Sequence, residues 1–300
     1  MTDVLAGVTL PQFTGDPDVL IDGAVRAEEA GLDSVWLFDH LWPLSGGKQR
    51  PIFESWTTLA WLAAATERVR IGTLVTRSSL RHPALLAKMI ATVAQVAPGR
   101  LIVAIGSGDD LSHDENEAFG MPYLAGADRV GQLHSAVEAV RRFLHEDPVD
   151  LVDDFVSIDD LPASPRGEAP PIWVAGRSDD ALEIAALHAD GWNGWGGSHT
   201  RFKQDAATVV ELAGDRSVEL TWGGLVVMGR DDASARDKLG SRTGKAYIVG
   251  GPETVASELK GFVDAGARHV IATFTDASDP EVYDLFGREV VPAVRSSASQ

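Results

Sequence analysis

The feature that most constrains the fold is an alternation of short apolar runs with helical segments along nearly the whole chain. Eight runs have the composition of buried strands, at residues 4–10, 34–38, 69–75, 101–105, 172–175, 191–195, 221–228 and 269–274. Between them Leu, Ala and Val recur at helical spacing, at residues 18–30, 56–65, 83–96, 127–144, 179–188, 202–212 and 252–265. Such repeats predict an α/β fold with a parallel sheet, and eight strands suffice to close a (β/α)8 TIM barrel.

Composition limits the remaining possibilities. The 300 residues, 44% of them hydrophobic, are enough for one such barrel, and we expect a single domain over residues 1–300. The chain has no cysteine, which excludes disulfides and thiolate chemistry, and no apolar run of membrane-spanning length, so we expect a cytoplasmic protein. A net charge of −18 argues against nucleic acid or an anionic membrane as partner. The histidines lack the spacing of a metal site, and we expect no metal.

The second apolar run ends abruptly in Asp39 and His40. A buried parallel strand is apolar on both faces, so an acid and a titratable group at its carboxyl end lie at the mouth of the sheet. In an eight-stranded α/β barrel this end carries the active site. His40 is therefore a candidate proton donor or acceptor, whereas the other histidines have no comparable position.

Three further turns lie at the same predicted face. The third strand is followed by Arg77 and Arg81, the fourth by the glycine-rich stretch 106–110, and the fifth by Gly176 and Arg177. Glycines permit close approach of a ring or phosphate, and arginine offers a fork of donors. Ordinary capped turns have the same composition. The stretch matches neither a dinucleotide fingerprint nor a P-loop, a nucleophile elbow is absent, and no strand-end lysine is placed to form a Schiff base.

Several blocks in this order resemble the luciferase-like flavin and deazaflavin oxidoreductases, particularly the coenzyme F420-dependent branch. They are residues 27–40, 69–84 with Lys88, 98–109, 171–192 and, more weakly, 249–267. Together they span almost the whole chain.

The resemblance implies roles for residues at the barrel mouth. Asp39 matches an acid that contacts the deazaflavin, and His40 matches a catalytic acid or base. A non-proline cis peptide is implied between Leu74 and Val75, bulging against the cofactor ring.

Two more segments match cofactor contacts. Ser107, Gly108 and Asp109 match a turn near the ring whose acid takes part in catalysis, although Asp109 is one methylene shorter than the glutamate usual there. The second segment is Ala175, Gly176 and Arg177, which match the residues that contact the ribityl-phosphate part of the cofactor in this family.

These matches imply an F420-dependent oxidoreductase that transfers a hydride between the deazaflavin and a small organic substrate. Two alternatives stay open, an FMN-dependent monooxygenase of the same fold and a non-catalytic flavin-binding protein. The sugar-phosphate dehydrogenases of this branch carry a lysine where this chain has Ser198, so glucose 6-phosphate is not the expected substrate.

Features around the mouth complete the expectations. Loops 43–53 and 111–125 are candidate lids, and the family's usual homodimer would form through the helices beside the second and fourth strands. Several aromatic residues are candidates for either a pocket wall or core packing: Trp36, Trp42, Phe53, Trp56, Trp192 and Trp195.

Overall fold

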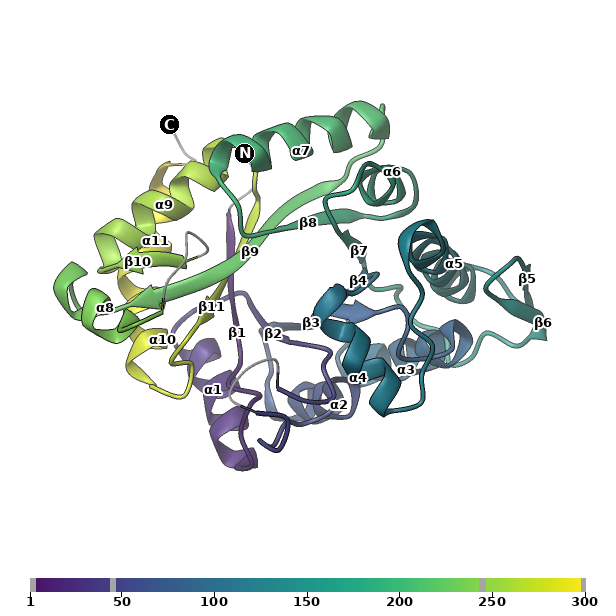
Figure 1. The fold of residues 1–300 in the computed structure, drawn as a ribbon, viewed down its shortest axis with the longest axis horizontal. Coiled ribbons are helices and arrows are strands. Elements are labelled where there is room, and N and C mark those ends of the chain that lie inside the picture. Colours follow the sequence, from purple (N-terminus) through teal and green to yellow (C-terminus); the bar gives the residue numbers. More distant parts are fainter. Residues whose placement is uncertain (1–3, 44–46, 243–246, 298–300) are drawn as a thin grey trace.

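The computed structural model describes residues 4–43, 47–242 and 247–297, and its centre is a closed barrel of parallel strands (Figure 1). Neighbouring strands pair in parallel, and the β1–β11 and β8–β9 pairings close the ring. The strands are β1 (Leu5–Thr9), β2 (Ser34–Leu37), β3 (Arg70–Arg77), β4 (Leu101–Gly106), β7 (Ile172–Ala175), β8 (Gly191–Trp195), β9 (Glu219–Met228) and β11 (His269–Phe274). All eight predicted strands and the (β/α)8 barrel are confirmed.

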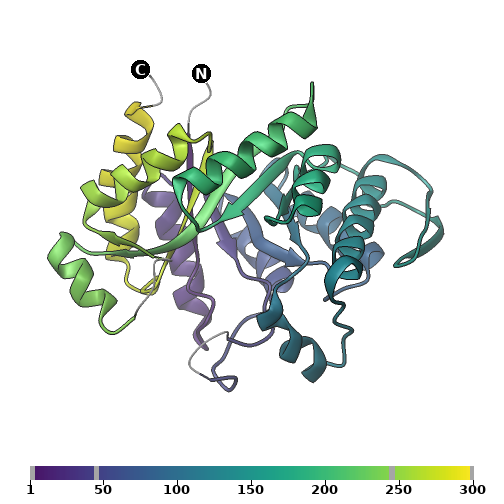
Figure 2. The same ribbon diagram turned by 45° about the horizontal axis from the view of Figure 1, so that its top comes forward.

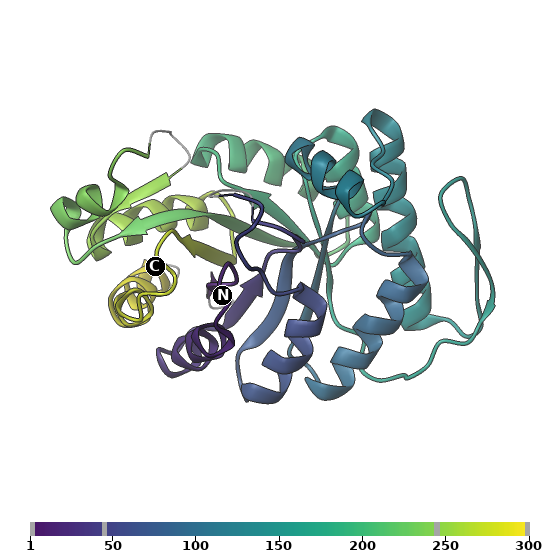
Figure 3. The same cartoon turned by 60° about the horizontal axis from the view of Figure 1, so that its bottom comes forward.

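Helices surround the barrel, as Figure 3 shows. The predicted ones correspond to α1 (Pro17–Glu29), α2 (Ser55–Ala65), α3 (Pro83–Val96), α5 (Gly126–His145), α6 (Asp179–His188), α7 (His199–Ala213) and α9 (Pro252–Asp264). Side chains cap several of their first turns: Asp16 accepts from the backbone N–H of α1, Glu54 from that of α2, and Ser178 from that of α6. In the part of the chain described, no helix is long and apolar enough to cross a membrane.

Several elements were not predicted. They are the turn η1 (Asp110–Ser112), α4 (His113–Ala118), the hairpin β5 (Val149–Val152) and β6 (Ser157–Leu161), α8 (Asp232–Leu239), β10 (Tyr247–Gly250), and α10 (Glu281–Leu285), η2 (Phe286–Val290) and α11 (Val291–Ser297). Acidic residues interrupt the apolar period in many of them; in β6, for example, only Ile158 is buried. The hairpin projects from the barrel in Figures 1 and 3.

The two candidate lids have different outcomes. Within 111–125 the structure places α4, a short helix with two buried polar residues, rather than an unstructured loop. Residues 44–46 of the other candidate, 43–53, lie outside the described residues.

One edge of β9 is shared by two strands. Residues 219–223 pair with β8, and residues 225–228 pair with β10 on the same side, while β11 pairs along the other edge. β9 therefore runs past the end of β8 toward α8, as Figure 2 shows. The strand β10 thus extends the sheet without taking part in barrel closure.

Two tryptophans fill the barrel interior opposite residues without side chains. Trp36 and Trp173 are fully buried and stack with their ring centroids 5.2 Å apart. A Cβ on Gly72 would lie 2.6 Å from both the Trp36 ring and the Ile102 carbonyl oxygen, and one on Gly191 would lie 2.4 Å from Trp173. Large side chains here depend on small ones in neighbouring strands, as expected for a close-packed interior.

The first prediction concerns this packing. Gly72→Ala is expected to lower the free energy of unfolding by about 1–3 kcal/mol, because backbone and ring atoms must move to admit the methyl group. Urea denaturation followed by circular dichroism measures the loss. Ala207→Ser, at an exposed position on α7, is the control and should change stability by less than about 0.5 kcal/mol. Equal stability of the two variants would contradict the packing argument.

Candidate active site

The carboxyl ends of neighbouring strands bring the predicted polar residues to one side of the barrel. Asp39 and His40 follow β2, Arg77 ends β3, and Gly106 ends β4. β2, β3 and β4 are adjacent in the sheet, which places these residues side by side. The clustering of Asp39, His40 and the turn after β4 is as predicted.

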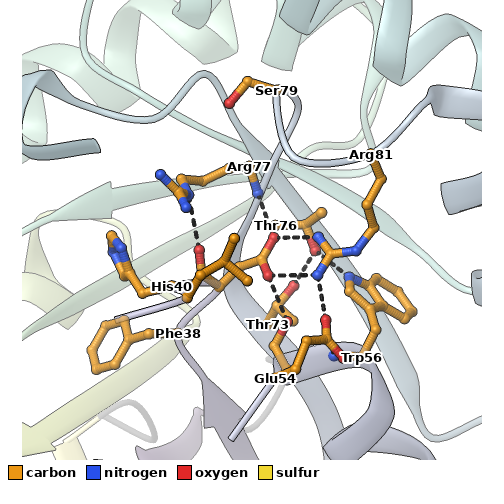
Figure 4. A network of polar contacts seen from close by, with 12 residues as sticks. Phe38, His40, Glu54, Trp56, Thr73, Thr76, Arg77, Ser79 and Arg81 are labelled. Atoms are coloured by element: carbon orange, nitrogen blue, oxygen red, sulfur yellow. Dashed lines mark hydrogen bonds and ion pairs between the residues drawn. The ribbon is translucent and has the colours of Figure 1, made fainter. Parts of the chain in front are cut away.

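The carboxylate of Asp39 is the centre of a buried network (Figure 4). The guanidinium of Arg81 donates to both of its oxygens, at 2.7 and 2.9 Å, and the hydroxyl of Ser55 donates to Oδ1 at 2.6 Å. The backbone N–H of Arg77 adds a bond of 3.0 Å to Oδ2. Arg81 also pairs with Glu54, the residue that caps α2. The carboxylate therefore links β2, α2, β3 and the turn before α3.

The charge of Asp39 is stabilised within the protein. Burial acts to raise the pKa of this carboxyl, but the hydrogen bonds and charge of Arg81, with the bonds from Ser55 and Arg77, hold the pKa below its usual range. With both oxygens hydrogen-bonded twice, the side chain acts as an anchor for its neighbours.

His40 has a partner that the sequence analysis did not identify. Its Nδ1 lies 3.0 Å from Oε2 of Glu115, a residue of α4 whose side chain is fully buried. The backbone N–H groups of Leu41 and Trp42 donate to the other oxygen of Glu115, and Nη2 of Arg77 lies 2.9 Å from Oε2. Within the described residues Nε2 of His40 has no hydrogen-bond partner in the protein, and 12% of the side chain is exposed.

Electrostatics determine which imidazole nitrogen carries the proton. Burial acts to raise the pKa of Glu115, but hydrogen bonds from His40 and Leu41 and the charge of Arg77 outweigh it, so the pKa is lowered. An ionised carboxylate can only accept, so Nδ1 of His40 is the donor. In the neutral imidazole the lone pair is then on Nε2, the nitrogen without a protein partner.

The sequence contains little that would have revealed Glu115. It lies in a six-residue helix, His113–Ala118, that has no apolar stripe, and acids of this kind are usually exposed. Its neighbour Asn116 is also buried and accepts a bond from Arg77 at 3.2 Å. The burial of these two polar residues is explained by Arg77, which contacts both of them in the folded structure.

The peptide between Leu74 and Val75 is cis, as the resemblance implied. The register between β3 and β4 shifts at this point, between Thr73 and Thr76. The Val75 side chain lies over Gly106, where a Cβ would be 2.6 Å from Val75 Cγ2, and Leu74 approaches Gly223 of β9. The bulge thus occupies space left by glycines on both sides of the barrel.

The turn after β4 exposes polar groups. Gly108 has φ +75°, a conformation that favours glycine, and Ser107 is half-buried. Asp109 is exposed and, from its place just before η1, accepts a 3.0 Å bond from the hydroxyl of Ser112, the last residue of η1. Asp109 therefore shapes this turn in addition to facing solvent.

The segment after β7 is held by the protein itself. Arg177 donates to the carbonyl of Gly196 at 2.9 Å and lies 3.5 Å from Asp205, and its guanidinium packs against Gly197. Its Nε is buried without a partner. Ala175 and Gly176 are half-buried beside it. Two of the three guanidinium nitrogens thus face protein groups, so Arg177 is not a free anion-binding fork.

Only part of the aromatic set lies at the mouth. Trp36, Trp56 and Trp192 are buried core residues. Trp195, at the end of β8, is 40% exposed and meets Phe38 edge to face across the barrel, with centroids 6.0 Å apart. Trp195 lies beside Gly223, which Leu74 of the cis peptide also approaches.

A cavity of about 400 Å³ lies where β8 and β10 separate. Its lining includes Gly196, Gly197, Ser198, His199, Trp222, Tyr247, Ile248, Val249, Thr254, Glu258 and Phe262. Ser198 caps α7 by accepting from the backbone N–H of Arg201, and His199 lies 3.4 Å from Glu258. No lysine or arginine belongs to this lining as far as the described residues extend.

A closed parallel barrel with an acid–histidine pair and a glycine-rich turn at its carboxyl face defines the class of (β/α)8 barrel enzymes. Residues 3–279 match the model of the luciferase-like monooxygenase family. The chain belongs to this family.

Relatives of known name agree with this assignment. The chain is 30% identical to an F420-dependent glucose-6-phosphate dehydrogenase of Kineococcus radiotolerans, over 93% of this chain and 94% of that protein. It is 32% identical to an F420-dependent hydroxymycolic acid dehydrogenase of Mycobacterium tuberculosis, over 62% of this chain and 51% of that one. Among solved structures, an F420-dependent secondary alcohol dehydrogenase bound to an F420–acetone adduct superimposes with a TM-score of 0.85 at 21% identity, covering 98% and 100% of the two chains.

The second prediction tests the buried network. Arg81→Met is expected to destabilise the protein by about 3–5 kcal/mol at neutral pH, because the Asp39 carboxylate stays buried without its main partner. In the wild type the pKa of the Asp39 carboxyl is lower in the folded than in the unfolded protein. The stability that this charge contributes is therefore present above the unfolded pKa, about 3.9, and is lost as the pH falls through the folded pKa. In the variant burial dominates, the folded pKa rises, and the deficit should shrink on acidification.

Urea denaturation at two pH values measures both effects. The double variant Asp39→Asn/Arg81→Met is the matched control, since it removes the unpaired charge and should regain part of the loss. A deficit that is independent of pH and simply additive in the double variant would contradict this account.

Proposed function

We propose that this enzyme is an F420-dependent oxidoreductase that transfers a hydride between the deazaflavin and an uncharged alcohol or carbonyl substrate. The observation that carries the proposal is His40, which is held at Nδ1 by a buried carboxylate and whose Nε2, at the barrel mouth, has no protein partner among the described residues. The family relationship and the F420-dependent relatives support the choice of cofactor.

The residues at the mouth fit a flat ring. The cis bulge at Leu74–Val75 presents backbone and the Val75 side chain, which lies over Gly106, and Gly108 carries no side chain in the turn after β4. Ser107 contributes a hydroxyl group, and Ala175 and Gly176 contribute small, half-buried residues. When bound, the deazaflavin supplies the hydride-accepting and hydride-donating carbon.

The protein's own contribution is proton transfer and orientation. Nε2 of His40 takes the hydroxyl proton of an alcohol, or returns a proton to a carbonyl oxygen, as the hydride moves. Glu115 holds the imidazole in the required tautomer and stabilises the imidazolium that forms. We assign Asp39 a positioning role, because its carboxylate is occupied by Arg81, Ser55 and Arg77. Asp109, exposed on the opposite turn, is the second candidate for proton exchange.

Anionic parts of the cofactor have few cations to bind. The guanidinium of Arg177 already donates to the carbonyl of Gly196, so only some of its N–H groups are left to bind an anion. The chain carries a net charge of −18. We propose that backbone N–H groups near Gly176 and Arg177 contact the phosphate and that the acidic tail extends into solvent.

We propose that the cavity beside β10 receives part of the substrate. Its described lining presents Trp222, Tyr247 and Phe262 and one carboxylate, Glu258, with no arginine or lysine to bind a phosphate. Ser198, where related sugar-phosphate dehydrogenases carry a lysine, already caps α7. We therefore expect an uncharged, partly apolar substrate rather than glucose 6-phosphate.

The third prediction addresses cofactor and substrate. Titration of the protein with F420 and separately with FMN, followed by tryptophan fluorescence, should give micromolar binding of F420 and weaker binding of FMN. With bound F420, uncharged secondary alcohols should bleach the visible absorbance of the oxidised cofactor, and glucose 6-phosphate should not. Tighter binding of FMN would favour a monooxygenase, and F420 binding without any His40-dependent reduction would favour a non-catalytic protein.

The fourth prediction isolates Glu115. In Glu115→Gln the amide oxygen faces the N–H groups of Leu41 and Trp42, so the amide NH2 donates to His40 and drives the proton to Nε2. We expect kcat to fall by about 10²–10⁴ with a smaller change in KM, because the wrong tautomer cannot accept the proton.

Nitrogen-15 NMR of the imidazole reads the tautomer without any substrate. Glu117→Gln, on the exposed side of α4, is the matched control and should leave both the tautomer and kcat unchanged. An unchanged tautomer in Glu115→Gln would remove the proposed role of Glu115.

The fifth prediction concerns assembly, and the enzyme is proposed to be a cytoplasmic homodimer. α2 has no charged residue, and the pair α2 and α3 exposes Trp61, Leu85 and Val96. The expected interface thus includes α2, which follows the second strand, and α3, which precedes the fourth. Light scattering should give a dimer for the wild type and a monomer for Trp61→Glu, whereas Leu212→Glu on α7 stays dimeric. A monomeric wild type would overturn this proposal.

A further inference from the structure

Two histidines face each other on the outside of the barrel, away from the groups used above. His134 on α5 and His188, the last residue of α6, have their Nε2 atoms 3.4 Å apart. The ring planes are inclined at 76°, with centroids 4.7 Å apart, and both residues are half-buried. Neither was singled out by the sequence analysis, because they are far apart in the chain.

The separation of the two nitrogens is informative. A direct N–H donor bond in proteins is usually about 2.7–3.2 Å long, so 3.4 Å is long for an imidazole–imidazole bond. Two Zn–N bonds of about 2.0–2.1 Å at a tetrahedral angle hold their nitrogens about 3.3–3.4 Å apart. The pair therefore already has the spacing of two ligands on one metal ion.

The histidines open onto a groove with room for further ligands. The cavity between α5 and α6 has a volume of about 280 Å³, and Ala127, Gly131 and His134 line its α5 side. Asp180 and Glu183 line the same groove and are exposed, which makes its electrostatic potential more negative. Water molecules have space to complete a coordination shell.

The surrounding charges determine which ions fit. Glu138, one turn from His134 on α5, is occupied by Arg142 at 2.8 Å and Arg141 at 3.6 Å. Arg216 donates to the carbonyls of Ala186 and Ala189 beside His188. Glu138 is thus engaged by arginines, and a site whose fixed ligands are two imidazole nitrogens matches oxygen-seeking ions such as Mg²⁺ and Ca²⁺ poorly. Imidazole nitrogens suit Zn²⁺, Ni²⁺ and Cu²⁺.

We propose that His134 and His188 form a two-imidazole site for a divalent transition-metal ion, which joins α5 to α6 with water as the remaining ligands. Both imidazoles must be neutral to bind. Burial lowers the pKa of His188, and the neighbouring His134 lowers it further, which favours the neutral form of this one imidazole. Binding should therefore weaken as the pH falls through the histidine range.

Calorimetric titration of chelator-treated, full-length protein with ZnCl2 tests the site. We expect one ion per chain at neutral pH, and at least about tenfold weaker binding in His134→Gln and in His188→Gln. His145→Gln, at the exposed end of α5, is the matched control. His113→Gln is the second control, because His113, Asp114 and Glu117 form an exposed group of potential ligands on α4.

Spectroscopy of the wild type keeps the proposal testable where a variant fails to fold. Cu²⁺ added at one equivalent should show coupling to two imidazole nitrogens in its electron paramagnetic resonance spectrum. Zn²⁺ should also raise the melting temperature of the wild type and leave that of His188→Gln unchanged. Absence of saturable Zn²⁺ binding, loss of binding in His113→Gln instead, or coupling to a single nitrogen would each overturn the site.

Discussion

The Arg81–Asp39 ion pair is the interaction on which the geometry of the barrel mouth depends. A carboxylate removed from water is stable only when its charge and its lone pairs are all satisfied, and here a guanidinium, a hydroxyl and a backbone N–H do so. Each donor comes from a different element. The requirement to satisfy one buried charge therefore fixes α2, the end of β3 and the turn before α3 relative to His40.

A second buried acid extends this arrangement. Glu115 accepts hydrogen bonds from His40 and from the backbone N–H groups of Leu41 and Trp42. Arg77 lies between the two carboxylates and donates its Nε–H to the backbone carbonyl of Asp39 at 2.9 Å. Alternating charges in a buried site cost desolvation energy and offer little net stability, but they restrict each side chain to one orientation. For a proton-transferring imidazole such restriction is useful, because reactivity depends on the direction of one lone pair.

The strands and major helices could be predicted because each carries its own signal. β4, for example, reads Leu101–Gly106 with every residue buried, and a continuous apolar run of that length is recognisable in isolation. Asp39 and His40 were identifiable since they interrupt such a run. Glu115 was not, because its burial results from contacts with Arg77 and Leu41 that are distant in sequence. Likewise β10 and the β5–β6 hairpin are stabilised by pairing partners rather than by a strong local pattern.

The way β8 and β10 divide one edge of β9 has a consequence for specificity. The cavity beside Trp222 exists because two backbones diverge, so its width is determined by where the hydrogen-bond ladder passes from one strand to the other. Lengthening or shortening β10 by a pair of residues would resize the pocket while every pairing that closes the barrel stays in place. Under the role proposed for this cavity, substrate range can thus evolve by insertion and deletion in a peripheral strand, without mutation of the residues around His40.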